Sequence, residues 1–92
     1  MREMVNTGYG FELQEDGTMV AEITYQKQGG VLIADHTFVS EELRGQKIAE
    51  QLLEELAGYA RENGYKIVPQ CSYVQTMFKR HDKYADVWKR EM

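Results

Sequence analysis

The chain has 92 residues, 42% of them hydrophobic, and a formal net charge of −4 at pH 7. This hydrophobic fraction excludes a disordered tail, and the acidic balance argues against general nucleic-acid binding. No apolar run is long enough to span a bilayer, and the single cysteine excludes an internal disulfide and fits a reducing compartment. We therefore expect one small domain over residues 1–92, located in the cytoplasm as a monomer or weak homodimer, with no membrane partner.

Three strands are predicted before residue 40. Tyr9 to Gln14 alternates moderately and is typical of an edge strand, and the Asp16-Gly17 pair that follows is a hairpin signal. Met19 to Gln26 has one convincingly apolar face, as in a half-buried antiparallel strand. Val31 to Val39 is apolar at both odd and even positions, which predicts a central strand covered on both faces.

A long amphipathic helix follows, from about Gln46 to Asn63, because apolar residues recur at four-residue spacing from Ile48 to Ala60. Gly64 is expected to end this helix, and Lys66 to Gln70 forms a short strand. Strand, helix and strand in this order predict a right-handed crossover with parallel strands. The loop before the helix then lies at the carboxyl end of the first strand, where open α/β sheets bind ligands.

The last part of the chain predicts a second helix from Ser72 to about His81, because Ser72 to Gln75 has the form of a capping box. A final helical turn is expected over Tyr84 to Trp88. The predicted fold class is therefore α/β (α+β-like), with a mixed sheet of about four strands and two helices packed on it.

The loop between the central strand and the long helix carries Arg44 and Gly45. A helix that begins here leaves backbone N–H groups unpaired at the positive end of its dipole. Arg44 and the amides of Gly45 to Ala49 are therefore candidates for binding phosphate. The alternative is a plain connecting loop with a solvated arginine.

This loop and the downstream Val68-Pro-Gln-Cys71 segment resemble the GCN5-related N-acetyltransferases, whose acetyl-coenzyme A loop reads Arg/Gln-x-x-Gly-x-Gly/Ala. The minimal single-domain branch of that superfamily pairs the loop with a downstream cysteine. The resemblance extends from about Phe11 to Tyr84. Lys47 stands where the family usually has glycine, a residue that tolerates positive φ better than lysine does. Lys47 could instead reach a phosphate as a point charge.

The resemblance implies acetyl transfer from acetyl-coenzyme A to an amine, either a protein or peptide lysine or a small amine. It also implies that the Val31–Val39 and Lys66–Gln70 strands separate at their carboxyl ends and that pantetheine lies between them. The acceptor site is expected to be open, since the chain is shorter than typical members. The residues expected to contact coenzyme A are Phe38, Val39, Ser40, Arg44, Gly45, Gln46, Lys47, Ile48, Ala49, Ser72 and Tyr73.

Cys71 lies between a strand end and a helix start, where the helix dipole stabilises a thiolate. It could accept the acetyl group or protonate the departing thiolate, or it could be a small buried apolar residue. His36 could remove the proton of the amine substrate, or it could be hydrogen-bonded within the sheet. Its position in the strand predicts that it shares a face with Ala34 and Phe38. His81 is interpreted as a structural complement to a helix end.

Tyr73, Tyr84 and Trp88 could line a pantetheine channel, although aromatic side chains in a small domain are more often core. One cysteine and two distant histidines do not form a metal-ligand set. The main alternative function is a non-catalytic module that binds coenzyme A or an acyl-coenzyme A and acts through a protein partner. A third hypothesis treats the loop as purely structural.

Overall fold

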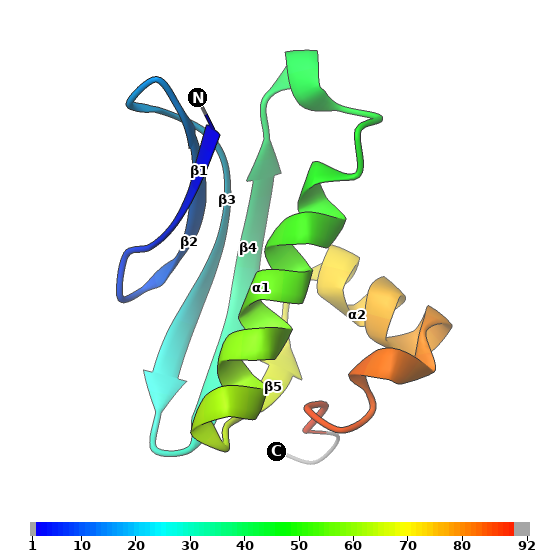
Figure 1. Ribbon diagram of the computed structural model, residues 1–92. Helices are drawn as coiled ribbons and strands as arrows, with labels where there is room; N and C mark the ends of the chain where they lie inside the picture. Colours follow the sequence, from blue (N-terminus) through cyan, green and yellow to red (C-terminus); the bar gives the residue numbers. More distant parts are fainter. Residues whose placement is uncertain (1, 90–92) are drawn as a thin grey trace.

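The computed structural model describes residues 2–89, which form a five-stranded sheet with two α-helices on one face (Figure 1). Neighbouring strands are antiparallel except the last pair, which is parallel. The mixed sheet is therefore confirmed, with one strand more than expected. In spatial order the strands are β1 (Arg2–Asn6), β2 (Gly10–Glu15), β3 (Thr18–Gln28), β4 (Val31–Val39) and β5 (Lys66–Pro69).

The additional strand β1 pairs along the whole of β2, so the predicted edge strand lies inside the sheet. Strand β1 was not predicted because its residues show no clear apolar alternation. Only Met4 packs against the core, whereas Arg2, Glu3 and Asn6 are exposed. Its formation depends on the hairpin partner that follows it in the chain.

Helix α1 (Ile48–Asn63) crosses β2 to β5, and helix α2 (Ser72–Arg80) contacts β5 beside it. Gly64 adopts φ +72° and donates its N–H to carbonyls of the last turn of α1, as the sequence predicted. No helix within residues 2–89 is long and apolar enough to cross a membrane. The core lies between α1 and the sheet, and its completely buried members include Ala21, Ile23, Leu32, Ala34, Leu52, Leu53, Leu56, Ala57, Ala60 and Ile67.

The final helical turn lies earlier than predicted, as a 3₁₀ helix, η2, over Asp82–Tyr84. Trp88 instead forms a parallel bridge beside Ile67 in β5. Ile67 donates its N–H to the Val87 carbonyl at 2.6 Å and accepts from the Lys89 N–H at 2.8 Å. These two hydrogen bonds pair the backbone groups of Ile67 on the outer edge of β5. The chain around Trp88 is therefore extended and not helical.

The aromatic side chains of this segment belong to the core, in agreement with the commoner interpretation. Tyr84 is completely buried, and its ring stacks on Phe78 with centroids 5.2 Å apart. The Tyr84 hydroxyl donates to Glu54 at 2.9 Å, and Trp88 packs edge-on against Phe78. These contacts join the segment from Tyr84 to Trp88 to α1 and α2.

A β-bulge at Asp35 reverses the alternation of side chains along β4. Thr24 of β3 lies opposite His36, whereas the next residue, Tyr25, lies opposite Ala34. The Asp35 carboxylate accepts hydrogen bonds from Thr24 Oγ1 and Gln26 Nε2, which hold the extra residue in place.

The bulge corrects two expectations. Thr37 and Val39 lie opposite the buried Ile23 and Ala21 and so face α1. His36 and Phe38 therefore face the opposite side and do not share a face with Ala34. Both are exposed, and neither α1 nor α2 covers that face, so β4 is not covered on both faces along its whole length.

Candidate functional site

Strands β4 and β5 separate halfway along β4. Their pairing ends where Ala34 meets Pro69, and the Ala34 carbonyl then accepts the N–H groups of both Gln70 and Cys71, at 3.0 and 2.8 Å. The proline and this shared acceptor end the ladder, because no further N–H of β5 can reach β4. Among residues 2–89, no strand consequently pairs with the five residues of β4 from Asp35 to Val39 on this edge.

The open edge of β4 offers backbone groups from Thr37 and Val39. The Ser40 N–H donates to Val20 of β3 at 2.8 Å. Because successive residues of a strand direct their N–H and C=O groups to opposite sides, Phe38 also bonds toward β3 while Thr37 and Val39 point into the gap.

Two of the predicted coenzyme contacts, Phe38 and Ser40, do not face this gap. Phe38 has its backbone on β3 and its ring on the far face. Ser40 uses its N–H on Val20, its carbonyl on Leu43 and its hydroxyl on Glu42. Of the three residues predicted on this strand end, only Val39 is placed toward the gap.

Helix α1 begins at the same end of the sheet with its first amides uncapped. The first intrahelical bond joins the Gln51 N–H to the Lys47 carbonyl at 3.1 Å, and no side chain caps the helix start. The N–H groups of the three residues Ile48 to Glu50 therefore remain available to a ligand. The Gln46 N–H, another predicted donor, instead donates to the Leu43 carbonyl within the loop at 3.2 Å.

The loop before α1 has two residues with positive φ, Gly45 at +89° and Lys47 at +60°. The family pattern places glycine at the second position, and the structure shows why, since Lys47 occupies the left-handed region as the N-cap of α1. Lysine holds the same loop shape at a cost in backbone strain.

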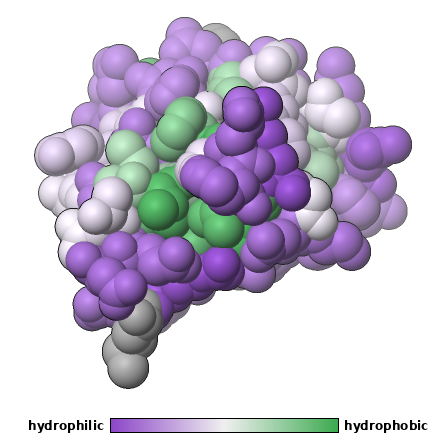
Figure 2. All heavy atoms as spheres, turned by 90° about the horizontal axis from the view of Figure 1, so that it is seen from above, coloured by the Kyte–Doolittle hydropathy of each residue, from purple (hydrophilic) through white to green (hydrophobic). Residues whose placement is uncertain are grey.

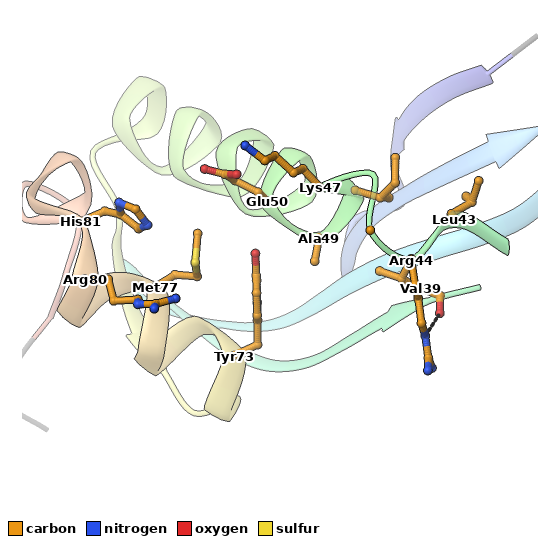
Figure 3. A pocket seen from close by; sticks show the side chains of 12 residues that line it. Val39, Leu43, Arg44, Lys47, Ala49, Glu50, Tyr73, Met77, Arg80 and His81 are labelled. Atoms are coloured by element: carbon orange, nitrogen blue, oxygen red, sulfur yellow. Dashed lines mark hydrogen bonds between the residues drawn. The ribbon is translucent and has the colours of Figure 1, made fainter. Parts of the chain in front are cut away.

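These elements surround a cleft of about 540 Å³ (Figure 3). Figure 2, seen from the end of the molecule where α1 begins, shows an apolar patch among hydrophilic side chains. Seven of the predicted residues line the cleft, whereas Phe38, Ser40, Gln46 and Ser72 do not. The lining consists of Val39, Leu43, Arg44, Gly45, Lys47, Ile48, Ala49, Glu50, Tyr73, Met77, Arg80 and His81.

The α2 wall of this cleft was largely missed by sequence reasoning. Tyr73, Met77, Arg80 and His81 follow one another at intervals of four, three and one residues, which places them on one face of a helix. That spacing was visible in the sequence, but its meaning depended on the packing of α2 beside α1. His81 lines the cleft as well as ending the helix.

The cleft is bordered by cations that have no carboxylate partner. Within residues 2–89, no salt bridge involves Arg44, Lys47 or Arg80, whereas Arg61 pairs with Asp86 at 2.7 Å. Arg44 makes one long hydrogen bond, 3.4 Å from Nε to the Val39 carbonyl oxygen (Figure 3). Such unpaired cations give the cleft a positive potential that favours an anionic ligand.

Burial raises the pKa of the Tyr73 phenol, and the nearby Glu50 and Cys71 act in the same direction. The hydroxyl therefore remains protonated at neutral pH and can donate a hydrogen bond into the cleft.

The two predicted catalytic residues lie on different sides of β4. Cys71 is the N-cap of α2, half-buried, with its Sγ 3.5 Å from the Thr37 hydroxyl at the point where the strands separate. His36 lies on the far face, 57% exposed, with Nε2 3.9 Å from a Glu22 carboxylate oxygen. Thr37, which was not among the predicted site residues, lies between them: it follows His36 in β4, and its hydroxyl contacts Cys71.

A protein-family model described as GCN5-related N-acetyl-transferase matches residues 10–87. The chain belongs to this family. A GCN5-like protein from Staphylococcus aureus, solved by NMR, is 34% identical to the chain with a TM-score of 0.80, and the match covers 98% of this chain and 90% of that one. No curated protein is similar enough to count as a match.

Two further structures share the fold at lower identity. A ribosomal-protein-alanine N-acetyltransferase from Brucella melitensis is 21% identical with a TM-score of 0.60, over 77% of this chain and 58% of that one. An aminoglycoside N-acetyltransferase in complex with coenzyme A is 16% identical with a TM-score of 0.52, over 77% and 63%. The chain therefore spans about three fifths of these larger proteins.

Proposed function

We propose that the protein is an acetyl-coenzyme A-dependent N-acetyltransferase whose cofactor lies in the cleft between β4 and α2. The observation that carries this proposal is the meeting of two unsatisfied backbone surfaces in one cleft. The open edge of β4 reaches the cleft at Val39, where it adjoins the uncapped start of α1. An elongated ligand with both amide and phosphate groups satisfies the two surfaces together.

Each part of the cofactor has a partner in this arrangement. The pyrophosphate accepts hydrogen bonds from the Ile48 to Glu50 amides and lies near Arg44 and Lys47. The amide groups of pantetheine bond to the backbone of Thr37 and Val39 in the manner of an added strand. Arg44 releases its 3.4 Å bond to the Val39 carbonyl when pantetheine takes that acceptor.

The thioester then lies where Cys71 and Thr37 meet. The amine nitrogen attacks the thioester carbonyl carbon, a C–N bond forms, and the C–S bond breaks to release the coenzyme A thiolate. Cys71 Sγ is placed to give its proton to that thiolate, with the Thr37 hydroxyl 3.5 Å away as its hydrogen-bond partner. The acetylated nitrogen then gives its extra proton to the Cys71 thiolate, which restores the thiol.

We assign to His36 the removal of a proton from the substrate ammonium before it attacks. The amine acceptor binds on the open face of the sheet. His36 is next to Thr37 in β4 and lies beside Glu22 on the face that neither helix covers. Carboxylates of this face attract a protonated amine before it is neutralised. The proposed acceptor is a primary amine, on a protein or peptide lysine or on a small molecule.

Calorimetric titration with acetyl-coenzyme A tests the binding site. Each charge-assisted contact contributes roughly 1.5–3 kcal/mol, so Arg44→Ala should weaken binding about tenfold or more. Arg61→Ala is the matched control, because Arg61 pairs with Asp86 outside the cleft and should leave affinity unchanged. Equal affinity of the wild-type and Arg44→Ala proteins would remove the loop from the site.

The alternative is a non-catalytic module that binds coenzyme A and acts through a protein partner. The position of His36 favours it, because this predicted base and the cleft lie on different sides of β4. Release of coenzyme A thiol in the presence of an amine library separates the two functions. Tight binding with no amine-dependent thiol release would support the module, and amine-dependent release supports the enzyme.

A further inference from the structure

The cleft carries two separate groups of basic side chains. Arg44 and Lys47 lie at the loop before α1, whereas Arg80 and His81 come from the last turn of α2 and the residue after it. Figure 3 shows Arg44 on one side of Tyr73 and Arg80 and His81 on the other, whereas the Lys47 side chain extends toward Glu50. The pyrophosphate subsite described above accounts for the first group only.

The second group is free to bind an anion. Arg80 is exposed, lines the cleft and forms no salt bridge within residues 2–89. Among the described residues that line the cleft, Glu50 is the only carboxylate, and it lies 3.5 Å from the Lys83 ammonium. The His81 ring stands edge-on to the buried Tyr84, with centroids 6.4 Å apart, which limits how it can turn.

The backbone does not explain an anion site at this end of α2. The carboxyl end of a helix carries partial negative charge and repels anions. Any anion bound there depends on the side chains of Arg80 and His81. The planar guanidinium of arginine suits a phosphate, because it can donate two parallel hydrogen bonds to its oxygens.

We propose that Arg80 and His81 bind the 3′-phosphate of coenzyme A and make the protein selective for the 3′-phosphorylated cofactor. This inference rests on the proposed function, since it places the pyrophosphate at α1. Coenzyme A has two anionic groups separated by its ribose, and the cleft offers Arg44 and Arg80 on opposite sides of Tyr73. Its volume of about 540 Å³ is within the range of sites that enclose small ligands.

The test compares coenzyme A with 3′-dephospho-coenzyme A by calorimetry. The wild-type protein should bind coenzyme A about tenfold or more tightly than the dephospho form, as expected for charge-assisted hydrogen bonds to one phosphate. Arg80→Ala should lose most of this preference while its affinity for the dephospho form stays within about twofold. His81→Ala should lose a smaller part, and Arg80→Lys should retain part of the preference because it keeps the charge.

Lys79→Ala is the matched control. Lys79 is adjacent, exposed and cationic but does not line the cleft, so its removal should keep the preference. Equal affinity of the wild-type protein for the two nucleotides, or an equal loss for both in Arg80→Ala, would overturn the inference while the proposed function stands. Failure of both nucleotides to bind the wild-type protein would overturn the proposed function and this inference with it. Thermal unfolding establishes that each variant is folded. Arg80→Glu, which repels phosphate, should reduce the preference for coenzyme A over its dephospho form at least as much as Arg80→Ala.

Discussion

Substitution of Lys47 by glycine separates the stability of the loop from its affinity for phosphate. Lys47 holds φ +60° and ψ +30°, a conformation that costs an L-residue with a side chain about 1–2 kcal/mol. Glycine removes that cost but loses about 0.5–1 kcal/mol of extra backbone freedom on folding. The net gain in the free energy of unfolding is therefore about 0.5–1 kcal/mol, equivalent to a rise in Tm of roughly 2–8 °C for a chain of this size.

The affinity for acetyl-coenzyme A should change in the opposite direction. The loop already has its left-handed conformation without ligand, so strain relief stabilises the free and bound protein equally. Lys47→Gly removes one cation from the cleft and should weaken binding several-fold, with a smaller dependence on salt.

Lys47→Ala provides the control, because it removes the charge but keeps a side chain at positive φ. It should lose affinity as Lys47→Gly does without the gain in Tm. A Lys47→Gly protein that melts no higher than Lys47→Ala would refute the strain argument. Tighter binding by Lys47→Gly would show that Lys47 does not contact phosphate.

Three further predictions concern the sheet, the ion pairs and the cysteine. Gly10→Ala places a methyl group against the Ile23 carbonyl oxygen and should lower the free energy of unfolding by about 1–3 kcal/mol in denaturant titrations. Gly58→Ala is the control, because Gly58 lies inside α1 with open space around it, and it should raise the free energy of unfolding by about 0.5–1 kcal/mol. Hydrogen bonding to Lys83 lowers the pKa of the Glu54 carboxyl. The stability that this ion pair contributes is therefore complete above the ordinary pKa of 4.5 and is lost as pH falls through the lower folded-state pKa. Lys83→Ala should reduce the dependence of the free energy of unfolding on pH between about pH 5 and pH 3, and an unchanged pH dependence would count against the pair. Cys71→Ala should abolish acetyl transfer while keeping most of the coenzyme A affinity. Saturating coenzyme A should slow alkylation of the wild-type thiol, and equal alkylation rates with and without coenzyme A would place the thiol outside the site.

The strand–helix–strand unit around the cleft was predictable because its signals are local. The structure confirms Val31–Val39 as β4, and α1 ends at Asn63 as expected from the apolar spacing and Gly64. The resemblance also identified the separation of β4 from β5, which the structure explains by Pro69 and by the Ala34 carbonyl.

The features that sequence reasoning missed depend on contacts between distant segments. The bulge at Asp35 is stabilised by Thr24 and Gln26 of another strand, so strict alternation placed His36 on the wrong face. Similarly, the helical spacing from Tyr73 to His81 is visible in the sequence, but only the packing of α2 beside α1 turns that face toward the cleft. Local patterns predicted the elements, whereas the site required their register and orientation.

Amide chemical shifts recorded during titration with acetyl-coenzyme A test the central claim most directly. We predict the largest saturable shifts at the amides of Thr37 and Val39 on the open edge of β4 and of Ile48 to Glu50 at the start of α1. Amides on the opposite side of the molecule, such as those of Glu12 and Gln14, should move little. The absence of saturable shifts at the α1 start, or shifts confined to other elements, would contradict the account.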